Sequence, residues 1–175
     1  MTHSPRQPTA ADPNEEVLAT VYASGGRRML GLGSLLVLGV MMLYLALTQS
    51  PNIEWRVFML LLGAVSLWMA QRMRVATANR IELTETVLRD SDGTVIARTS
   101  DIDGIDRGFF AFKPSNGFLL RTATAQRREW RPGLWWRMGR RIGVGGMTPG
   151  SQTKFMSEII AAMMAQRELD DDAQL

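Results

Sequence analysis

The chain has 175 residues, a formal net charge of +3 and 46% hydrophobic residues, which suits one domain with accessory segments. It has no cysteine, and its one histidine is His3, so we expect no disulfide, no thiol or histidine catalysis and no Cys- or His-based metal site. Without cysteine, the sequence does not indicate whether the protein works in an oxidising or a reducing compartment. The apolar residues are concentrated between positions 29 and 70, which indicates a membrane segment rather than an evenly distributed core.

The first 28 residues are expected to form a cytoplasmic N-terminal segment. Residues 1–13 are polar and contain proline, which predicts disorder. Residues 14–24 predict a short helix, with Asn14 as its N-cap and Glu15 and Glu16 in its first turn. Acidic residues ahead of a long apolar run argue against a secretory signal peptide.

Residues 29–48 contain no charged side chain and are the first predicted membrane span. Twenty helical residues rise about 30 Å, the thickness of the hydrocarbon core of a bilayer. Four small residues in this stretch allow close helix packing, although they do not form a GxxxG motif: Gly31, Gly33, Ser34 and Gly39.

Residues 57–70 form a second apolar run, which is long enough to span if Trp55 and Trp68 mark the interfaces and Arg56 extends outward to water. The turn around Pro51 and Asn52 is too short for a domain. We therefore predict a hairpin of two transmembrane helices over residues 29–73.

Basic residues predict the orientation of this hairpin. They flank both of its ends, as Arg27, Arg28, Arg72, Arg74 and Arg80, whereas in the turn Arg56 is balanced by Glu54. The positive-inside rule then places both termini in the cytoplasm, as expected for a multi-pass protein of a bacterial inner membrane.

Residues 77–167 have strand character. Ile81 and Leu83 alternate with polar residues along the strand predicted within 80–90, and residues 91–93 (SDG) signal a hairpin turn into a partner strand at 94–99. Further strands are predicted at 101–112 and 116–125, with a turn at 114–117, and two short ones at 134–138 and 141–146.

An amphipathic helix is expected near the C-terminus, with Ser151 or Thr148 as its N-cap. Its apolar face is made of Phe155, Met156, Ile159, Ile160, Met163 and Met164. This helix would close a curved antiparallel sheet, and residues 168–175 would follow as an acidic tail.

The chain at this point resembles the bacterial pleckstrin-homology-like (PH-like) domains that are attached to a two-helix membrane hairpin. The resemblance covers residues 80–167 and is carried by RIELTETVLRDSDGTVIA, AFKPSNGFLLR, GLWWRMGRRIGVGG and the terminal helix. It implies a mainly-β fold, a curved sheet or barrel closed by the C-terminal helix, and no particular activity.

Two short motifs suggest ligand sites, but each has a simpler structural interpretation. DIDGID (101–106) begins like a calcium loop, yet an EF-hand needs a glutamate where Phe112 stands, so we expect a strand bent at Gly104 with Ile102 and Ile105 inward. GVGGMTPGS (143–151) has the outer glycine spacing of a P-loop but lacks its Lys-Ser/Thr pair, so it predicts a turn into the helix.

The remaining candidate is a basic and aromatic window between residues 121 and 141, with seven arginines against one acid, Glu129. It can contact anionic lipid or a protein partner; a membrane anchor makes nucleic acid the least favoured ligand. Alternatively, one of two adjacent tryptophans fills the core, and the arginines are solvated or paired with Asp101, Asp103, Asp106 and Glu129. The candidate contact residues are Arg127, Arg128, Arg131, Trp135, Trp136, Arg137, Arg140 and Arg141.

No nucleophile–base pair can be assembled from this sequence, so no enzymatic activity and no cofactor are predicted. We expect a non-enzymatic adaptor that presents its β-domain at the membrane surface, where it binds lipid head groups or a neighbouring membrane protein. The alternative is an accessory subunit of a larger membrane complex, in which the soluble domain is chiefly structural.

Overall fold

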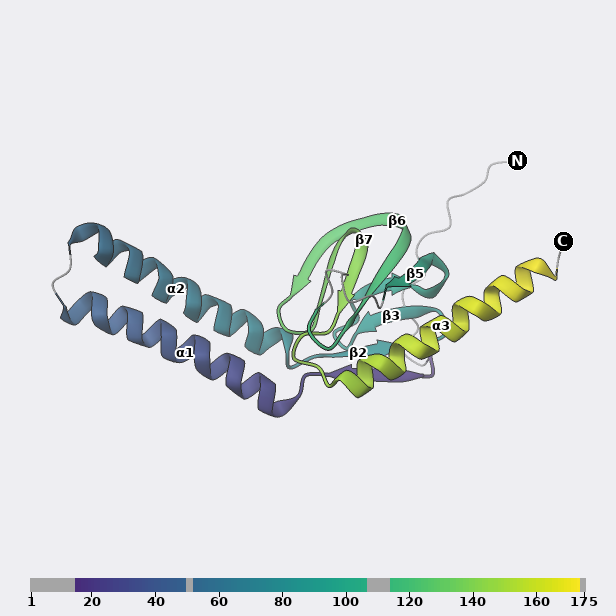
Figure 1. The fold of residues 1–175 in the computed structure, drawn as a ribbon, viewed down its shortest axis with the longest axis horizontal. Helices are drawn as coiled ribbons and strands as arrows, with labels where there is room; N and C mark the ends of the chain where they lie inside the picture. The colour runs from purple at the N-terminus through teal and green to yellow at the C-terminus, as the bar shows by residue number, and fades with distance from the viewer. Residues whose placement is uncertain (1–14, 50–51, 107–113, 174–175) are drawn as a thin grey trace.

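The computed structural model describes residues 15–49, 52–106 and 114–173. Two long helices form a hairpin that joins a mainly-β domain, and a third helix runs beneath that domain (Figure 1). The strands of the described segments form one sheet of four and one sheet of three, both antiparallel. The sequence allowed for a barrel, but these two sheets do not join into a closed one.

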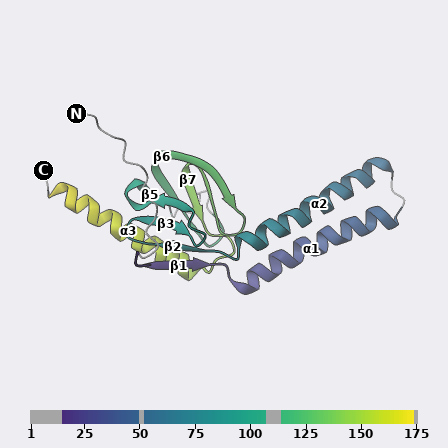
Figure 2. The same ribbon diagram turned by 180° about the vertical axis from the view of Figure 1, so that it is seen from behind.

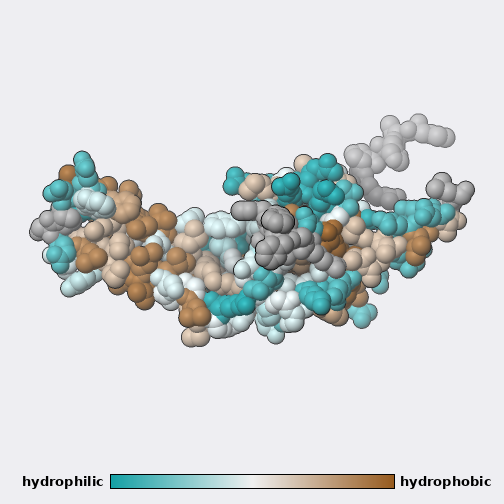
Figure 3. Space-filling view, viewed as in Figure 1, coloured by the Kyte–Doolittle hydropathy of each residue, from teal (hydrophilic) through white to brown (hydrophobic). Residues whose placement is uncertain are grey.

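The hairpin consists of α1 (Gly25–Thr48) and α2 (Ile53–Ala76), each of 24 residues. Both helices are long and apolar enough to cross a membrane. Their large apolar side chains point outward, and the hairpin surface in Figure 3 is accordingly dominated by hydrophobic residues. Both helices extend beyond the predicted apolar runs because a helix continues through its polar ends once its ladder of hydrogen bonds is formed.

Small residues bring the two helices together. A Cβ atom added to Gly39 would lie 2.7 Å from Leu67 Cδ2 and 3.2 Å from the main-chain oxygen of Gly63. Gly39 therefore has the packing role expected from the sequence, whereas Gly33 faces open space. Arg56 is exposed, and its Nε donates a hydrogen bond to the Ala46 carbonyl at 2.9 Å, one of the last carbonyls of α1.

The first strand, β1 (Ala19–Tyr22), lies in the segment for which the sequence predicts a short helix. It pairs antiparallel with β2 (Arg80–Leu83), so that Val21 faces Ile81. Val21 is fully buried, and pairing with a strand that follows the hairpin outweighs the local helix signals. The hairpin is thus inserted between two neighbouring strands of one sheet, visible from behind in Figure 2.

The same sheet continues with β3 (Val87–Asp90) and β4 (Val95–Arg98), joined by the predicted turn at 91–93. The strand expected within 80–90 is in fact two, β2 and β3. Thr84 causes the break: its hydroxyl accepts a hydrogen bond from the main-chain nitrogen of Val87 at 3.1 Å, which closes a tight turn.

The second sheet contains β5 (Ile102–Asp106), β6 (Phe118–Arg131) and β7 (Trp135–Val144), and the short helix η1 (Thr99–Asp101) leads into it. As predicted, β5 is irregular next to Gly104 and buries Ile102. The two strands predicted at 134–138 and 141–146 are one continuous strand.

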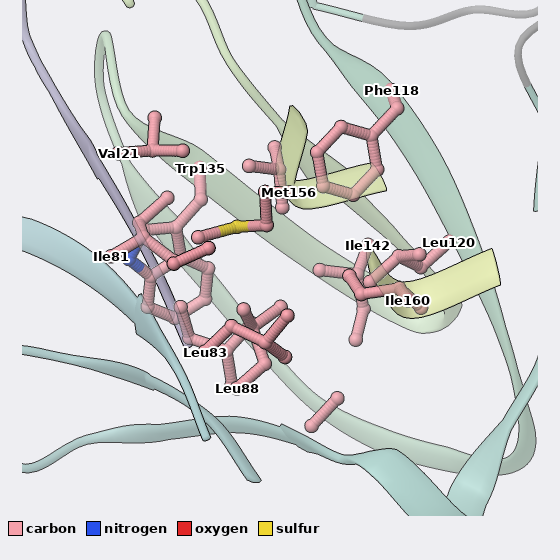
Figure 4. Packing of buried hydrophobic residues seen from close by; sticks show 14 of the residues in the cluster. Val21, Ile81, Leu83, Leu88, Phe118, Leu120, Trp135, Ile142, Met156 and Ile160 are labelled. Atoms are coloured by element: carbon pink, nitrogen blue, oxygen red, sulfur yellow. The ribbon is translucent and has the colours of Figure 1, made fainter. Parts of the chain in front are cut away.

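Helix α3 (Gly150–Asp172) packs its apolar face against both sheets, where Met156 and Ile160 meet Trp135, Ile142 and side chains of β1 and β2 (Figure 4). Three details differ from the prediction. Phe155 is 56% exposed, no side chain caps the helix, and the helix continues through the acidic residues to Asp172. Because β1 also belongs to this domain, the domain includes residues on both sides of the hairpin.

Candidate functional site

The candidate window lies on the ribbon formed by β6 and β7. Its register is interrupted twice, between Arg121 and Gln126 and between Gln126 and Glu129, and Gly139 adopts a left-handed φ of 60°. These irregularities bend the ribbon so strongly that the Gly145 nitrogen at its end donates to the Leu134 carbonyl at its start, at 2.8 Å. The ribbon therefore curls over the core instead of extending into solvent.

Trp135 is the tryptophan that fills the core, at 1% exposure. Its indole Nε1 donates a 3.0 Å hydrogen bond to Asp90 Oδ2, which connects the two sheets. Burial raises the pKa of Asp90, and this bond from Trp135 partly opposes that rise. Trp136 points the other way and covers Gly143, where there is no room for a side chain, so it is half-buried.

Arg137 is an internal structural residue, in contrast to its predicted contact role. It is 9% exposed and stacks over the Trp135 ring at 5.8 Å. Its guanidinium group donates five hydrogen bonds, to the main-chain oxygens of Val95, Ile96 and Arg127 at 2.9 Å, to Gln126 Oε1 at 3.0 Å and to Glu129 Oε2 at 3.2 Å. The side chain thereby joins β4 of the first sheet to β6 and β7 of the second.

Three further arginines are engaged in ion pairs on the surface of the domain. Arg131 is bound by Asp92 at 2.7 Å and by Glu129 at 3.4 Å. Burial opposes ionisation of Asp92, but hydrogen bonds from Thr94 and the charge of Arg131 outweigh it and hold the pKa of Asp92 below its usual value. Arg121 and Arg140 both approach Asp103, at 3.7 and 3.9 Å. Pairing with Asp103 and Glu129 was one of the alternatives open from the sequence; for Asp101 the observed partners are Thr124 and Gln126.

The other three candidates, Arg127, Arg128 and Arg141, are exposed. Within the described parts of the chain, their side chains have no hydrogen-bond or ion-pair partner. Among the residues that the structure describes, these three arginines of the window therefore keep a positive charge without a partner. Trp130 is the exposed tryptophan of the window, at 44%, although it was not among the residues selected from the sequence.

Arg128 and Trp130 line a groove that the sequence did not predict. Its volume is about 560 Å³, and its walls are residues 128–132 at and just after the end of β6 and four residues at the end of α2: Gln71, Arg72, Val75 and Ala76. Arg72 lies on the α2 side, with its guanidinium 5.7 Å from the centre of the Trp68 ring. In the sequence, Arg72 served only to predict the orientation of the hairpin, because no local pattern relates it to a strand more than fifty residues away.

The glycine-rich segment between β7 and α3 is a turn, as expected. Gly145 and Gly146 have φ angles of 135° and 125°, which favour glycine. A Cβ atom on Gly145 would lie 2.6 Å from the Gly117 Cα, so neighbouring backbone packs closely against this turn. Among the residues that the structure describes, no group of three or more metal-ligating side chains is assembled.

The structure thus defines a mainly-β domain of two antiparallel sheets with a terminal helix, joined to two helices of membrane-spanning length and composition. Comparisons with protein-family models, curated proteins and solved structures find no match to the chain.

Proposed function

We propose that this chain is an integral membrane protein that presents a PH-like domain at the cytoplasmic membrane surface, in a non-enzymatic role. One observation carries the proposal: the segments that enter and leave the hairpin pair as neighbouring strands, Val21 opposite Ile81. Both ends of the hairpin must then lie on the same side of a membrane. The arginines at those ends favour the cytoplasmic side, as in a bacterial inner membrane.

The joint between hairpin and domain supports a fixed position of the domain beside the bilayer. The Ser24 nitrogen donates to the Met147 carbonyl at 2.8 Å, and Arg27 donates to the Thr148 carbonyl at 3.3 Å. The Met147 side chain lies directly over Gly31 of α1. A domain held in this way presents a constant face to lipid head groups or to a neighbouring membrane protein.

The experiment is a combined extraction and topology assay on the full chain in bacterial cells. We expect the protein to stay in the membrane after an alkaline carbonate wash and to dissolve only in detergent. Reporters fused before Met1 and after Leu175 should both be active in the cytoplasm. Release by carbonate, or a reporter that is active in the periplasm, would contradict the proposal.

A second candidate is an accessory subunit of a larger membrane complex. Helix α3 extends beyond the sheets in Figure 1 and exposes Phe155 and Leu169, by 56% and 63%. A contact with another protein would cover both of these apolar side chains. Purification in mild detergent tests this alternative, which predicts a stable co-purifying partner that is lost in a variant with both residues changed to serine.

A further inference from the structure

We infer that the groove between α2 and β6 binds the phosphate head group of an anionic phospholipid. The inference deepens the proposed function and rests on it, because it requires the hairpin to span the bilayer. In this site, Arg72 and Arg128 bind the phosphate, and the exposed ring of Trp130 lies beside it.

The position of the groove fits the head-group layer. Helix α2 has 24 residues and is therefore about 36 Å long, whereas the hydrocarbon core is about 30 Å thick. The excess of about 6 Å is roughly one turn, which places Arg72 and the residues after it at the membrane–water interface, with Trp68 at the edge of the hydrocarbon core. Trp68 is 55% exposed there, one turn before Arg72, and tryptophan is enriched at this depth. The groove begins at the same turns and opens beside them.

The charges of the groove suit a phosphate. Arg72 and Arg128 come from different elements and have no carboxylate partner in the described part of the chain, so both retain their full charge. The acidic residue of the groove, Glu129, is already shared between Arg131 at 3.4 Å and Arg137 at 3.2 Å. Two guanidinium groups that line one groove, neither of them held by a carboxylate among the described residues, supply the donors that bind phosphate oxygens.

The apolar parts of the groove favour a lipid over a free phosphate ion. Val75 and Trp130 are 53% and 44% exposed within it. A soluble anion would leave both wet, whereas the glycerol and first methylenes of a phospholipid would cover them. A volume of about 560 Å³ is in the range of sites that hold small organic ligands.

The test uses the full chain purified in detergent with a mixture of phosphatidylglycerol and phosphatidylcholine, and counts retained lipids by native mass spectrometry. The wild type should retain phosphatidylglycerol preferentially. The R72Q/R128Q variant should lose roughly 25-fold in that preference, since each arginine near an anionic surface accounts for about fivefold. The matched control is R127Q, because Arg127 is exposed and unpaired among the described residues but does not line the groove.

Equal retention of both lipids by the wild type would overturn the inference, as would an equal loss in R127Q and R72Q/R128Q. Displacement of the lipid by inorganic phosphate alone would overturn it too, since the site would then be one for a free anion. In all three cases the carbonate assay would still place the protein in the membrane. Failure of that assay would instead remove the proposed function itself.

Discussion

The hairpin and the β-domain use apolar residues in opposite ways. Only 11% of the apolar window of α1 and 17% of that of α2 is buried, and what the helices bury against each other is mostly small, such as Gly39 and Gly63. The domain buries large side chains completely, such as Leu120 and Ile142. Apolar composition alone therefore does not define a core, because a helix surrounded by lipid gains nothing by burying its apolar side chains in protein.

The hairpin and the domain also differ in where their polar groups find hydrogen-bond partners. The domain buries charged side chains and bonds them to distant partners: Glu82 accepts from Arg89 at 3.1 Å, and Arg137 has five acceptors, whereas buried Asp90 has a bond from Trp135 on Oδ2 and no hydrogen-bond partner on Oδ1 among the described residues. Along the hairpin, Ser34 and Ser66 donate to carbonyls of their own helix, at 2.8 Å each. A helix therefore satisfies its polar groups locally, whereas the domain needs partners that are distant in sequence.

The largest effect is expected from separating β1 from the rest of the domain. A chain that begins at Thr77 lacks Val21, which is fully buried, and leaves β2 as an open edge next to α3. We expect this fragment to be unfolded, without a cooperative transition in far-UV circular dichroism. A chain in which residues 25–76 are replaced by a short Gly/Ser linker should fold, because Tyr22 and Arg80 are paired neighbours.

The linker chain is also the control, since it lacks the hairpin but keeps β1. A cooperative transition in the fragment that begins at Thr77 would show that the domain folds without the N-terminal strand. It would contradict the view that the domain depends on partners that are distant in sequence.

The next largest effect concerns Arg137, the polar centre of the domain. Substitution by leucine leaves its five acceptors without their donor, and breaking a buried pair of this kind costs about 3–5 kcal/mol. The matched variant Arg141→Leu changes an exposed arginine of the same strand and should stay within about 0.5 kcal/mol of the wild type. Urea unfolding of the linker chain measures both, and similar values would contradict the internal role of Arg137.

A third prediction applies to the interior of the hairpin. Gly39→Leu places a side chain where a Cβ atom alone would lie 3.2 Å from the Gly63 carbonyl oxygen, so the helices must separate, at a cost of about 1–3 kcal/mol. Gly33→Leu meets open space and should have little effect. Thermal unfolding of the full chain in detergent measures the difference, and equal melting temperatures would show that close packing of the helices is unimportant.

The smallest effect is a pH dependence from Asp90. Burial raises its pKa above the ordinary value of 3.8, so the folded state favours the protonated form. Its contribution to stability is complete below pH 3.8 and is lost as the pH rises through the folded pKa. Relative to Asp90→Asn, the wild type should therefore lose stability from acidic towards neutral pH.

The comparison with Asp90→Asn is needed because other carboxyl groups titrate in the opposite direction. Hydrogen bonds from Arg80 and Arg89 outweigh burial and lower the pKa of Glu82, whose stabilisation is lost as the pH falls. Unfolding of the linker chain across this pH range gives the difference, and a constant difference would mean that Asp90 has the same pKa in the folded and unfolded states.

The predictions from sequence succeeded where one local pattern determines the outcome. The predictions of a long apolar helix over residues 29–48, of a turn at SDG and of an apolar helix face around Met156 and Ile160 are confirmed. Predictions failed where a distant partner decides: residues 19–22 became a strand because β2 was available, and residues 135–144 form one strand because β6 pairs with them on both sides of its two register shifts. The individual roles of the arginines were beyond local inference for the same reason.

The sequence by itself determined two helices of membrane-spanning length, antiparallel strands and a terminal helix, because hydrophobic periodicity and turn residues act over a few positions. The pairing of β1 across the hairpin, the burial of Arg137 and the groove that Arg128 shares with Arg72 follow from long-range contacts. These features depend on which carbonyls, carboxylates and helix ends come together in space, and residue spacing along the chain does not encode that.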